Sequence, residues 1–145
     1  MSEILWLQSE VRLHPKRRGF HLVTEEIIAQ VAGLEKIEIG MAHFLLKHTS
    51  ASLSLNENAD PTVRDDMEQY FNRVAPENQD YFKHTLEGAD DMPAHLKAAL
   101  VGTELNIPIS RGQLNLGTWQ GIYLGEHRDN GGSRRIVVTV NGKSF

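Results

Sequence analysis

Apolar and polar residues alternate near the start of the chain, which predicts strand structure there. Apolar side chains recur imperfectly from residue 4 to residue 13, as in a strand with one buried face. Residues 14–19 contain proline and glycine and are typical of a turn, and residues 20–23 can form a returning strand. The pattern therefore predicts a β-hairpin at the start of the chain.

A longer apolar stretch covers residues 37–47. Its second half is apolar on both faces, which is typical of a strand in the middle of a sheet. A short alternating segment at 52–56 predicts the next strand. Strand patterns then dominate the end of the chain, and strands are expected at 104–109, 113–126 and 134–140.

Three segments have the pattern of helices. Thr24 can cap the first helix, and Gly33 can end it. The dipeptide at 60–61, aspartate followed by proline, is typical of a helix start, and the apolar stripe after it lasts to about residue 75. A third helix is predicted from about residue 92 to residue 100.

Size and composition are those of one globular domain. The chain has 145 residues, of which 40% are hydrophobic and 23% charged, so we expect a single domain over residues 1–145. The formal net charge of −4 argues against general nucleic-acid binding, which needs a basic surface. Apolar runs such as 136–140 are far shorter than the roughly 20 residues of a membrane span, and the first residues lack a signal-peptide pattern. We therefore expect a cytoplasmic protein with no nucleic-acid or membrane partner.

Groups that bind metals are densest between His84 and His95. Because the chain has no cysteine, a divalent metal here would need histidine or carboxylate ligands. The spacing of the two histidines fixes no geometry, so a polar loop leading into a helix is the alternative. The carboxylates between them belong to Glu87, Asp90 and Asp91.

Hydroxyl groups follow the apolar stretch that ends at residue 47. Thr49 and Ser50 come directly after His48, and loops that follow strands commonly carry functional side chains. Hydroxyl groups can donate hydrogen bonds to phosphate oxygens. These residues are therefore candidates for binding a phosphorylated ligand.

The segment 131–135 is a second candidate phosphate site. Its sequence, Gly-Gly-Ser-Arg-Arg, offers backbone amides, the hydroxyl group of Ser133 and the guanidinium group of Arg134. A glycine-rich hairpin turn is the alternative. The chain has no Walker-type loop or dinucleotide fingerprint, so we expect no nucleotide cofactor.

Two further carboxylates lie at positions in the sequence that are typical of functional groups. Glu126 ends an apolar strand, where a buried acid is costly unless it pairs with a cation, a histidine or a metal. Glu57 can orient a ligand histidine or act as a general base, and a solvated loop acid is its alternative.

Four segments of the chain carry distinctive sequence motifs: 48–60, 87–88 with 95–97, 107–112 and 116–126. In these segments the chain resembles the YjbQ family, also described as secondary thiamine-phosphate synthases. The sequence Gly-Thr-Trp-Gln at 117–120 is the most specific of these motifs. The resemblance implies an α+β fold, with a mixed or antiparallel sheet packed against two to three helices. It also implies a homotrimer with a bound metal near histidines, in a pocket at or near subunit contacts.

The resemblance also assigns site residues. Three imidazoles would leave an open position on zinc, the expected metal, with magnesium as the alternative. The chain departs from the family pattern before His95, where Asp-Asp-Met-Pro leaves open which aspartate matches. The implied metal ligands are His48, His84 and His95. The family pattern also requires the acid Glu126. Together with the chemistry of the residues themselves, the catalytic candidates are Glu57, Asp91 and Glu126, and the phosphate-binding candidates are Thr49, Ser50, Ser133 and Arg134.

The implied reaction couples hydroxymethylpyrimidine diphosphate with thiazole phosphate and releases pyrophosphate. The family name describes this activity as secondary. Such a reaction needs charge neutralisation on the leaving diphosphate and alignment of the thiazole nitrogen. Two alternatives remain open: a metal-dependent hydrolase of a small phosphorylated metabolite, and a non-catalytic trimeric module that binds an anionic metabolite.

Overall fold

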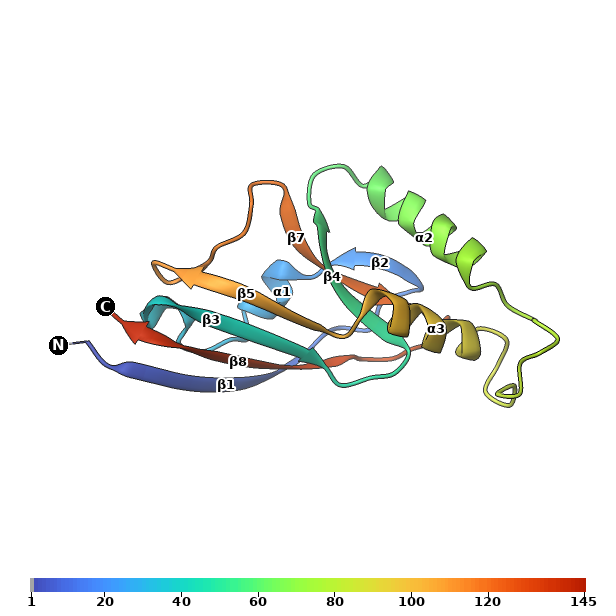
Figure 1. Ribbon diagram of the computed structural model, residues 1–145, viewed down its shortest axis with the longest axis horizontal. Coiled ribbons are helices and arrows are strands. Elements are labelled where there is room, and N and C mark those ends of the chain that lie inside the picture. The colour runs from blue at the N-terminus through green and yellow to red at the C-terminus, as the bar shows by residue number, and fades with distance from the viewer. Residues whose placement is uncertain (1) are drawn as a thin grey trace.

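The larger of two sheets contains five antiparallel strands (Figure 1). The computed structural model describes residues 2–145, so Met1 of the predicted domain lies outside the described residues. Every second residue along the first part of β8 is buried, as expected for a strand with one face on the core. In spatial order the strands are β1 (Ile4–Arg12), β8 (Arg135–Ser144), β3 (Ile37–Leu46), β5 (Glu104–Ser110) and β6 (Gln113–Leu114).

The smaller sheet contains three antiparallel strands with β7 at its centre. β7 is buried from Gly121 to Glu126. Its register pairs Glu126 with both Gly19 and Ala51, so the end of β7 lies between the starts of its two neighbours. These strands are β2 (Gly19–Leu22), β7 (Gln120–Glu126) and β4 (Ala51–Glu57).

The hydrophobic core joins the two sheets. Phe44 and Val138 from the larger sheet belong to the same buried cluster as Ile122 and Leu124 from the smaller one. Each of these side chains is at most 1% exposed. Burial of this apolar surface is the main force that holds the sheets together.

The predicted opening hairpin is wrong. β1 pairs with β8 in the larger sheet, whereas β2 pairs with β7 in the smaller sheet. Residues 13–18 carry the chain from one sheet to the other. Alternation of apolar residues reports which face of a strand is buried, but it does not report the partner strand.

The predicted strand at 113–126 is two strands in different sheets. β6 ends at Leu114, and a turn tied by side-chain amides precedes β7. Asn58 donates from Nδ2 to the carbonyl groups of Thr118 and Gln120, and the backbone N–H of Gly117 donates to Oε1 of Gln120. The two bonds from Asn58 join residues about 60 positions apart in the sequence, so local pattern alone could not reveal the break.

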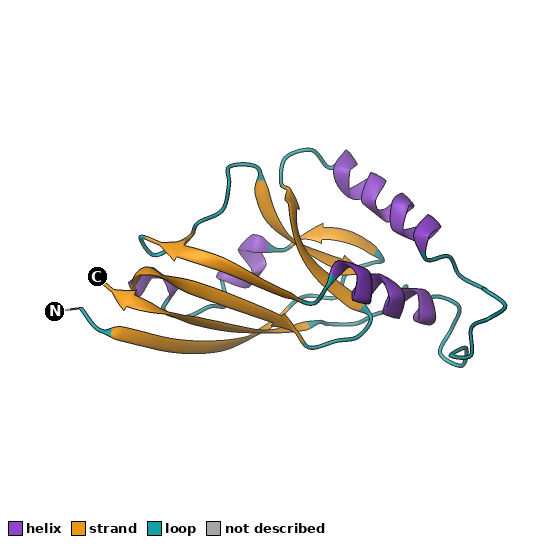
Figure 2. Ribbon diagram, viewed as in Figure 1, coloured by secondary structure: helices purple, strands orange, loops and turns teal. Residues whose placement is uncertain are grey.

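Three helices accompany the sheets, and Figure 2 shows the two longer ones at the same end of the molecule. The third ends at Gly102, whose φ of +105° lies in the region that favours glycine. Asp60 accepts a hydrogen bond from the backbone N–H of Thr62, so it supports the start of the second helix. The helices are α1 (Thr24–Ile28), α2 (Thr62–Val74) and α3 (Asp91–Val101), and a short 3₁₀ helix η1 covers Leu34–Lys36.

The prediction of a single α+β domain with antiparallel sheet and two to three helices is confirmed. Over residues 2–145, no helix combines the length and the apolar character needed to cross a membrane.

Thr24 does not cap α1 as predicted. Its Oγ1 accepts a hydrogen bond of 2.8 Å from the backbone N–H of Ile122, and no side chain caps α1. The hydroxyl group therefore satisfies a backbone donor of β7 that lies 98 residues away in the sequence.

Replacement of Thr24 tests this contact. Thr24→Val keeps the shape of the side chain but leaves the N–H of Ile122 without its acceptor, so unfolding free energy should fall by about 1–3 kcal/mol. Thr24→Ser keeps the hydroxyl group and should lose clearly less. Urea denaturation measures both variants, and no loss in Thr24→Val, or a larger loss in Thr24→Ser, would contradict the role of the hydroxyl group.

Candidate metal centre

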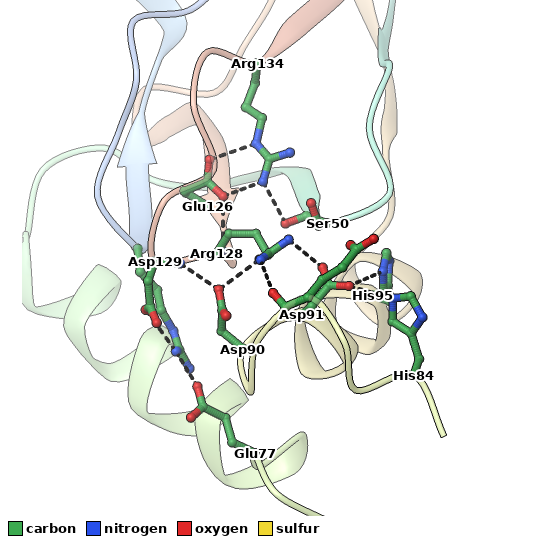
Figure 3. Close-up of polar contacts among 12 residues, drawn as sticks. Ser50, Glu77, His84, Asp90, Asp91, His95, Glu126, Arg128, Asp129 and Arg134 are labelled. Atoms are coloured by element: carbon green, nitrogen blue, oxygen red, sulfur yellow. Dashed lines mark hydrogen bonds and ion pairs between the residues drawn. The ribbon is translucent and has the colours of Figure 1, made fainter. Parts of the chain in front are cut away.

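The start of α3 presents an acid and a histidine on the same face. Asp91 and His95 are four residues apart, which is about one helical turn. His84 reaches the same point from the preceding loop, which Gly88 reverses with a φ of +105°. Nε2 of His84 lies 2.6 Å from Oδ2 of Asp91, and Nε2 of His95 lies 3.2 Å from the same oxygen (Figure 3).

The hydrogen bond on the other side of His95 fixes its proton. Nδ1 of His95 lies 2.9 Å from the carbonyl oxygen of Thr49. A carbonyl oxygen can only accept, so Nδ1 carries the hydrogen, and Nε2 of the neutral ring turns a lone pair toward Asp91. A lone pair facing a carboxylate is stable only with a cation between them, either a proton or a metal. Backbone carbonyls orient metal-binding histidines in this way.

Arg128 holds Asp91 in place. Its Nη1 bonds Oδ1 of Asp91 at 2.7 Å, its Nε bonds Asp90 at 2.8 Å, and its Nη2 bonds the carbonyl oxygen of Glu87 at 2.8 Å. Burial would raise the pKa of Asp91, but the hydrogen bond from His84 and the charge of Arg128 outweigh burial and lower it. Asp91 is therefore anionic at neutral pH, with Oδ2 directed at the histidines.

The two adjacent aspartates have different contacts. Asp91 is 1% exposed and faces both histidines. Asp90 faces Arg128, and its Oδ2 accepts a hydrogen bond of 2.9 Å from the backbone N–H of Asp129. This difference resolves the ambiguity of the sequence, because only Asp91 is placed to bind a metal.

The donor set fits a transition metal. His84, Asp91 and His95 each offer one ligand atom, and these atoms lie within 4.8 Å of one another. Ligand atoms about 2.0–2.2 Å from zinc lie about 3–3.5 Å apart, so the separation between His95 and Asp91 fits directly. His84 must move slightly outward, and its side chain is 49% exposed. Two nitrogens and one oxygen suit zinc better than magnesium, which prefers oxygen ligands.

His48 lies outside this group. Its Nε2 accepts the backbone N–H of Arg135 at 2.9 Å. Burial lowers the pKa of His48, and the charge of Arg134 lowers it further, so the ring is neutral at pH 7. Of the three histidines that the resemblance implies as ligands, the structure brings two together, with Asp91 as the third group.

Glu126 and Arg134 form a buried ion pair. Nε of Arg134 lies 2.8 Å from Oε1 of Glu126, and Nη2 lies 2.6 Å from Oε2. Nη2 of Arg134 also lies 3.2 Å from the carbonyl oxygen of Ser50. A Cβ atom at Gly131 would lie 2.3 Å from Oε1 of Glu126, so only glycine allows this loop to approach the pair. The costly buried acid is thus paired with a cation.

Comparison with known proteins identifies the family. The family model described as "UPF0047 protein YjbQ-like" matches residues 9–143. The UPF0047 protein YjbQ of Escherichia coli O157:H7 is 55% identical over 139 residues, which are 96% of this chain and 100% of that protein. The chain belongs to the YjbQ family.

Solved structures agree with the fold. A YjbQ/UPF0047 protein from Clostridium acetobutylicum is 35% identical, and the match covers 90% of this chain and 98% of the other with a TM-score of 0.78. A protein from Sulfolobus solfataricus P2 matches with a TM-score of 0.81 over 97% of this chain and 99% of the other. At 24% identity, this second likeness bears on the fold alone.

The remaining predicted site residues of this YjbQ-family chain lie at different distances from the metal centre. Thr49 is exposed beside His95, whereas Ser50 is buried, with its carbonyl group on Arg134. Ser133 is half-buried next to Arg134. Glu57 lies at the other end of β4, roughly 20 Å along the strand from Ala51, and its Oε2 accepts the backbone N–H of Asp60. A single YjbQ-family chain therefore does not bring Glu57 to the metal centre.

Sequence reasoning missed Arg128 and the burial of His127 against Ser52. No spacing rule links Arg128 to Asp91, which lies 37 residues earlier. Nε2 of His127 lies 2.9 Å from Oγ of Ser52. Burial, assisted by the charges of Lys97 and Arg134, lowers the pKa of His127 to about 3, so it is neutral.

Zinc titration of metal-free protein tests the ligand set. We expect His84→Ala, Asp91→Asn and His95→Ala each to weaken binding at least about 100-fold, because loss of an outer partner alone costs 10–100-fold. His48→Ala should leave the affinity unchanged. The reverse result, with weaker zinc binding in His48→Ala and unchanged binding in Asp91→Asn, would instead support a site of three histidine ligands.

The ion pair can be tested by unfolding. Glu126→Ala leaves the Arg134 guanidinium buried without a counter-charge, and we expect a loss of about 3–5 kcal/mol in unfolding free energy. The exposed pair of Glu10 and Lys47, at 3.2 Å, supplies the matched control. Glu10→Ala should cost no more than about 1 kcal/mol. Similar losses in both variants would contradict the role of burial.

Proposed function

We propose that this chain is a metal-dependent enzyme that acts on a small phosphorylated metabolite, with the metal held by His84, Asp91 and His95. The observation that carries the proposal is the bond from Nδ1 of His95 to the carbonyl oxygen of Thr49, which aims Nε2 at a buried, anionic Asp91. Three protein ligands leave at least one position open, as in catalytic rather than structural sites.

The reaction we propose is the coupling that forms thiamine phosphate. When bound, the metal would supply Lewis-acid stabilisation of a diphosphate leaving group. Thr49 is exposed next to His95, so it offers a hydroxyl-bearing residue beside the ligands. Arg128 holds Asp91 in its charged form and orientation.

Coupling is favoured over hydrolysis by the position of the acids. Hydrolysis by general-base catalysis needs a group that takes a proton from water. Glu126 is committed to Arg134, and Glu57 lies at the far end of β4. Coupling mainly needs charge neutralisation and alignment, which the metal centre can provide without a nearby carboxylate base.

The proposal includes self-association as a homotrimer in the cytosol. On the outer face of the larger sheet, Ile4 and Trp6 are 68% and 69% exposed, and Ile39 is 62% exposed. The register places Ile4 and Ile39 on either side of Lys143, so the apolar residues lie on one face. Exposed apolar patches of this kind mark interaction surfaces.

Product analysis of zinc-loaded protein tests the reaction. With hydroxymethylpyrimidine diphosphate and thiazole phosphate, we expect thiamine phosphate and pyrophosphate in equal amounts. His95→Ala and Asp91→Asn should lose at least about 100-fold in rate, because they remove a metal ligand. His21→Ala is the matched control, since His21 is a histidine of β2 in the smaller sheet, with its Nε2 2.7 Å from the carbonyl oxygen of Arg17.

Other outcomes would replace the proposed reaction. Phosphate release without coupling would favour the hydrolase. Unchanged substrates that remain tightly bound would favour the binding module. Full activity after removal of the metal would overturn the metal-dependent mechanism.

A further inference from the structure

A cavity lies away from the metal centre. It has a volume of about 620 Å³ and opens between α1, β6 and the turn that precedes β7. Gln120 lines it and pairs with Glu57 at one end of β4, whereas Ala51 pairs with Glu126 at the other end. The two sites are therefore separated by about the length of a seven-residue strand, roughly 20 Å.

The floor of this cavity is apolar. Ile28, Leu34 and Leu114 line it, and all three pack against the hydrophobic core. The volume falls within the roughly 300–1,000 Å³ of small-molecule sites. The floor can therefore take a flat apolar group of a small ligand.

The wall beside the turn is preformed. Nδ2 of Asn58 donates to the carbonyl oxygens of Thr118 and Gln120, at 3.1 and 3.0 Å. A Cβ atom at Gly121 would lie 2.7 Å from the side chain of Leu22, so the wall is closely packed. A ligand would enter a site whose shape is already fixed, which lowers the cost of binding.

The mouth of the cavity is acidic. Glu26 lines it but is already bonded to Lys16 and to the backbone N–H of His14, each at 2.6 Å. Glu25 also lines it, lies exposed in the first turn of α1, and its carboxylate has no hydrogen bond or ion pair among residues 2–145. None of the lining residues is basic. The uncommitted charge is thus a carboxylate above an apolar floor.

We propose that this cavity binds a small organic cation with a flat apolar body, whose ammonium or amidinium group pairs with Glu25. The carboxylate selects the charge, and the apolar floor selects the ring. The side-chain amide of Gln113 lies on the rim, where it can bond the polar edge of the ligand. This inference does not depend on the proposed reaction at the metal centre.

Nitrogen-15 NMR with benzamidine as the probe tests the site. Benzamidine carries an amidinium group on a phenyl ring, and benzamide is its neutral counterpart. We expect benzamidine to shift the side-chain amide signals of Gln113 and Gln120, and to leave the backbone signals of Asp91 and His95 unchanged. Benzamide should bind several-fold more weakly.

Removal of one charge supplies the second arm. Glu25→Gln should weaken benzamidine about twofold to fivefold, the range of an exposed ion pair. Glu35→Gln is the matched control, because Glu35 lies in η1 and does not line the cavity. If both variants bind benzamidine equally weakly, the loss of affinity would come from the change in net charge alone, and the role of Glu25 would be overturned. Equal binding of benzamide, or no shift of Gln113 and Gln120, would overturn the cation site itself.

Discussion

The buried ion pair between Glu126 and Arg134 joins the parts of the chain on which the metal centre depends. Glu126 ends the central strand of the smaller sheet, and Arg134 directly precedes the first residue of β8 in the larger sheet. Arg134 also bonds the carbonyl group of Ser50. The neighbouring residue Thr49 supplies the carbonyl group that orients His95. This one ion pair therefore links the two sheets to each other and to the loop at 49–50, whose carbonyl group sets the tautomer of His95.

A second guanidinium group extends this arrangement to the acid. The backbone N–H of Arg128 donates to Glu126, while its side chain bonds Asp90 and Asp91. Two carboxylates face one arginine, which leaves one negative charge in excess beside two imidazoles. A low-dielectric setting strengthens the attraction of such a site for a cation. The same contacts keep Asp91 charged and leave its Oδ2 facing the two histidines.

Sequence patterns located most elements but not their partners. The strand at 37–47 was predicted because its apolar residues are continuous, and β3 occupies nearly that range. The hairpin prediction was wrong because residues 13–18 cross between sheets, a path that alternation does not report. The break within 113–126 was missed because Asn58, more than 50 residues earlier, holds the turn. At this break, long-range side-chain bonds override local propensity.

The sequence by itself determined the chemistry available to this protein. It excluded thiolate ligands, since there is no cysteine, and it placed histidines and aspartates between residues 84 and 95. It also carried the motifs of the YjbQ family. Only the tertiary structure decided that Asp91 joins His84 and His95 while His48 bonds the backbone of Arg135. Spacing within a loop fixes no distance between side chains. The packed strands and the start of α3 do fix these distances, and they bring His84 and His95 within hydrogen-bond distance of Asp91.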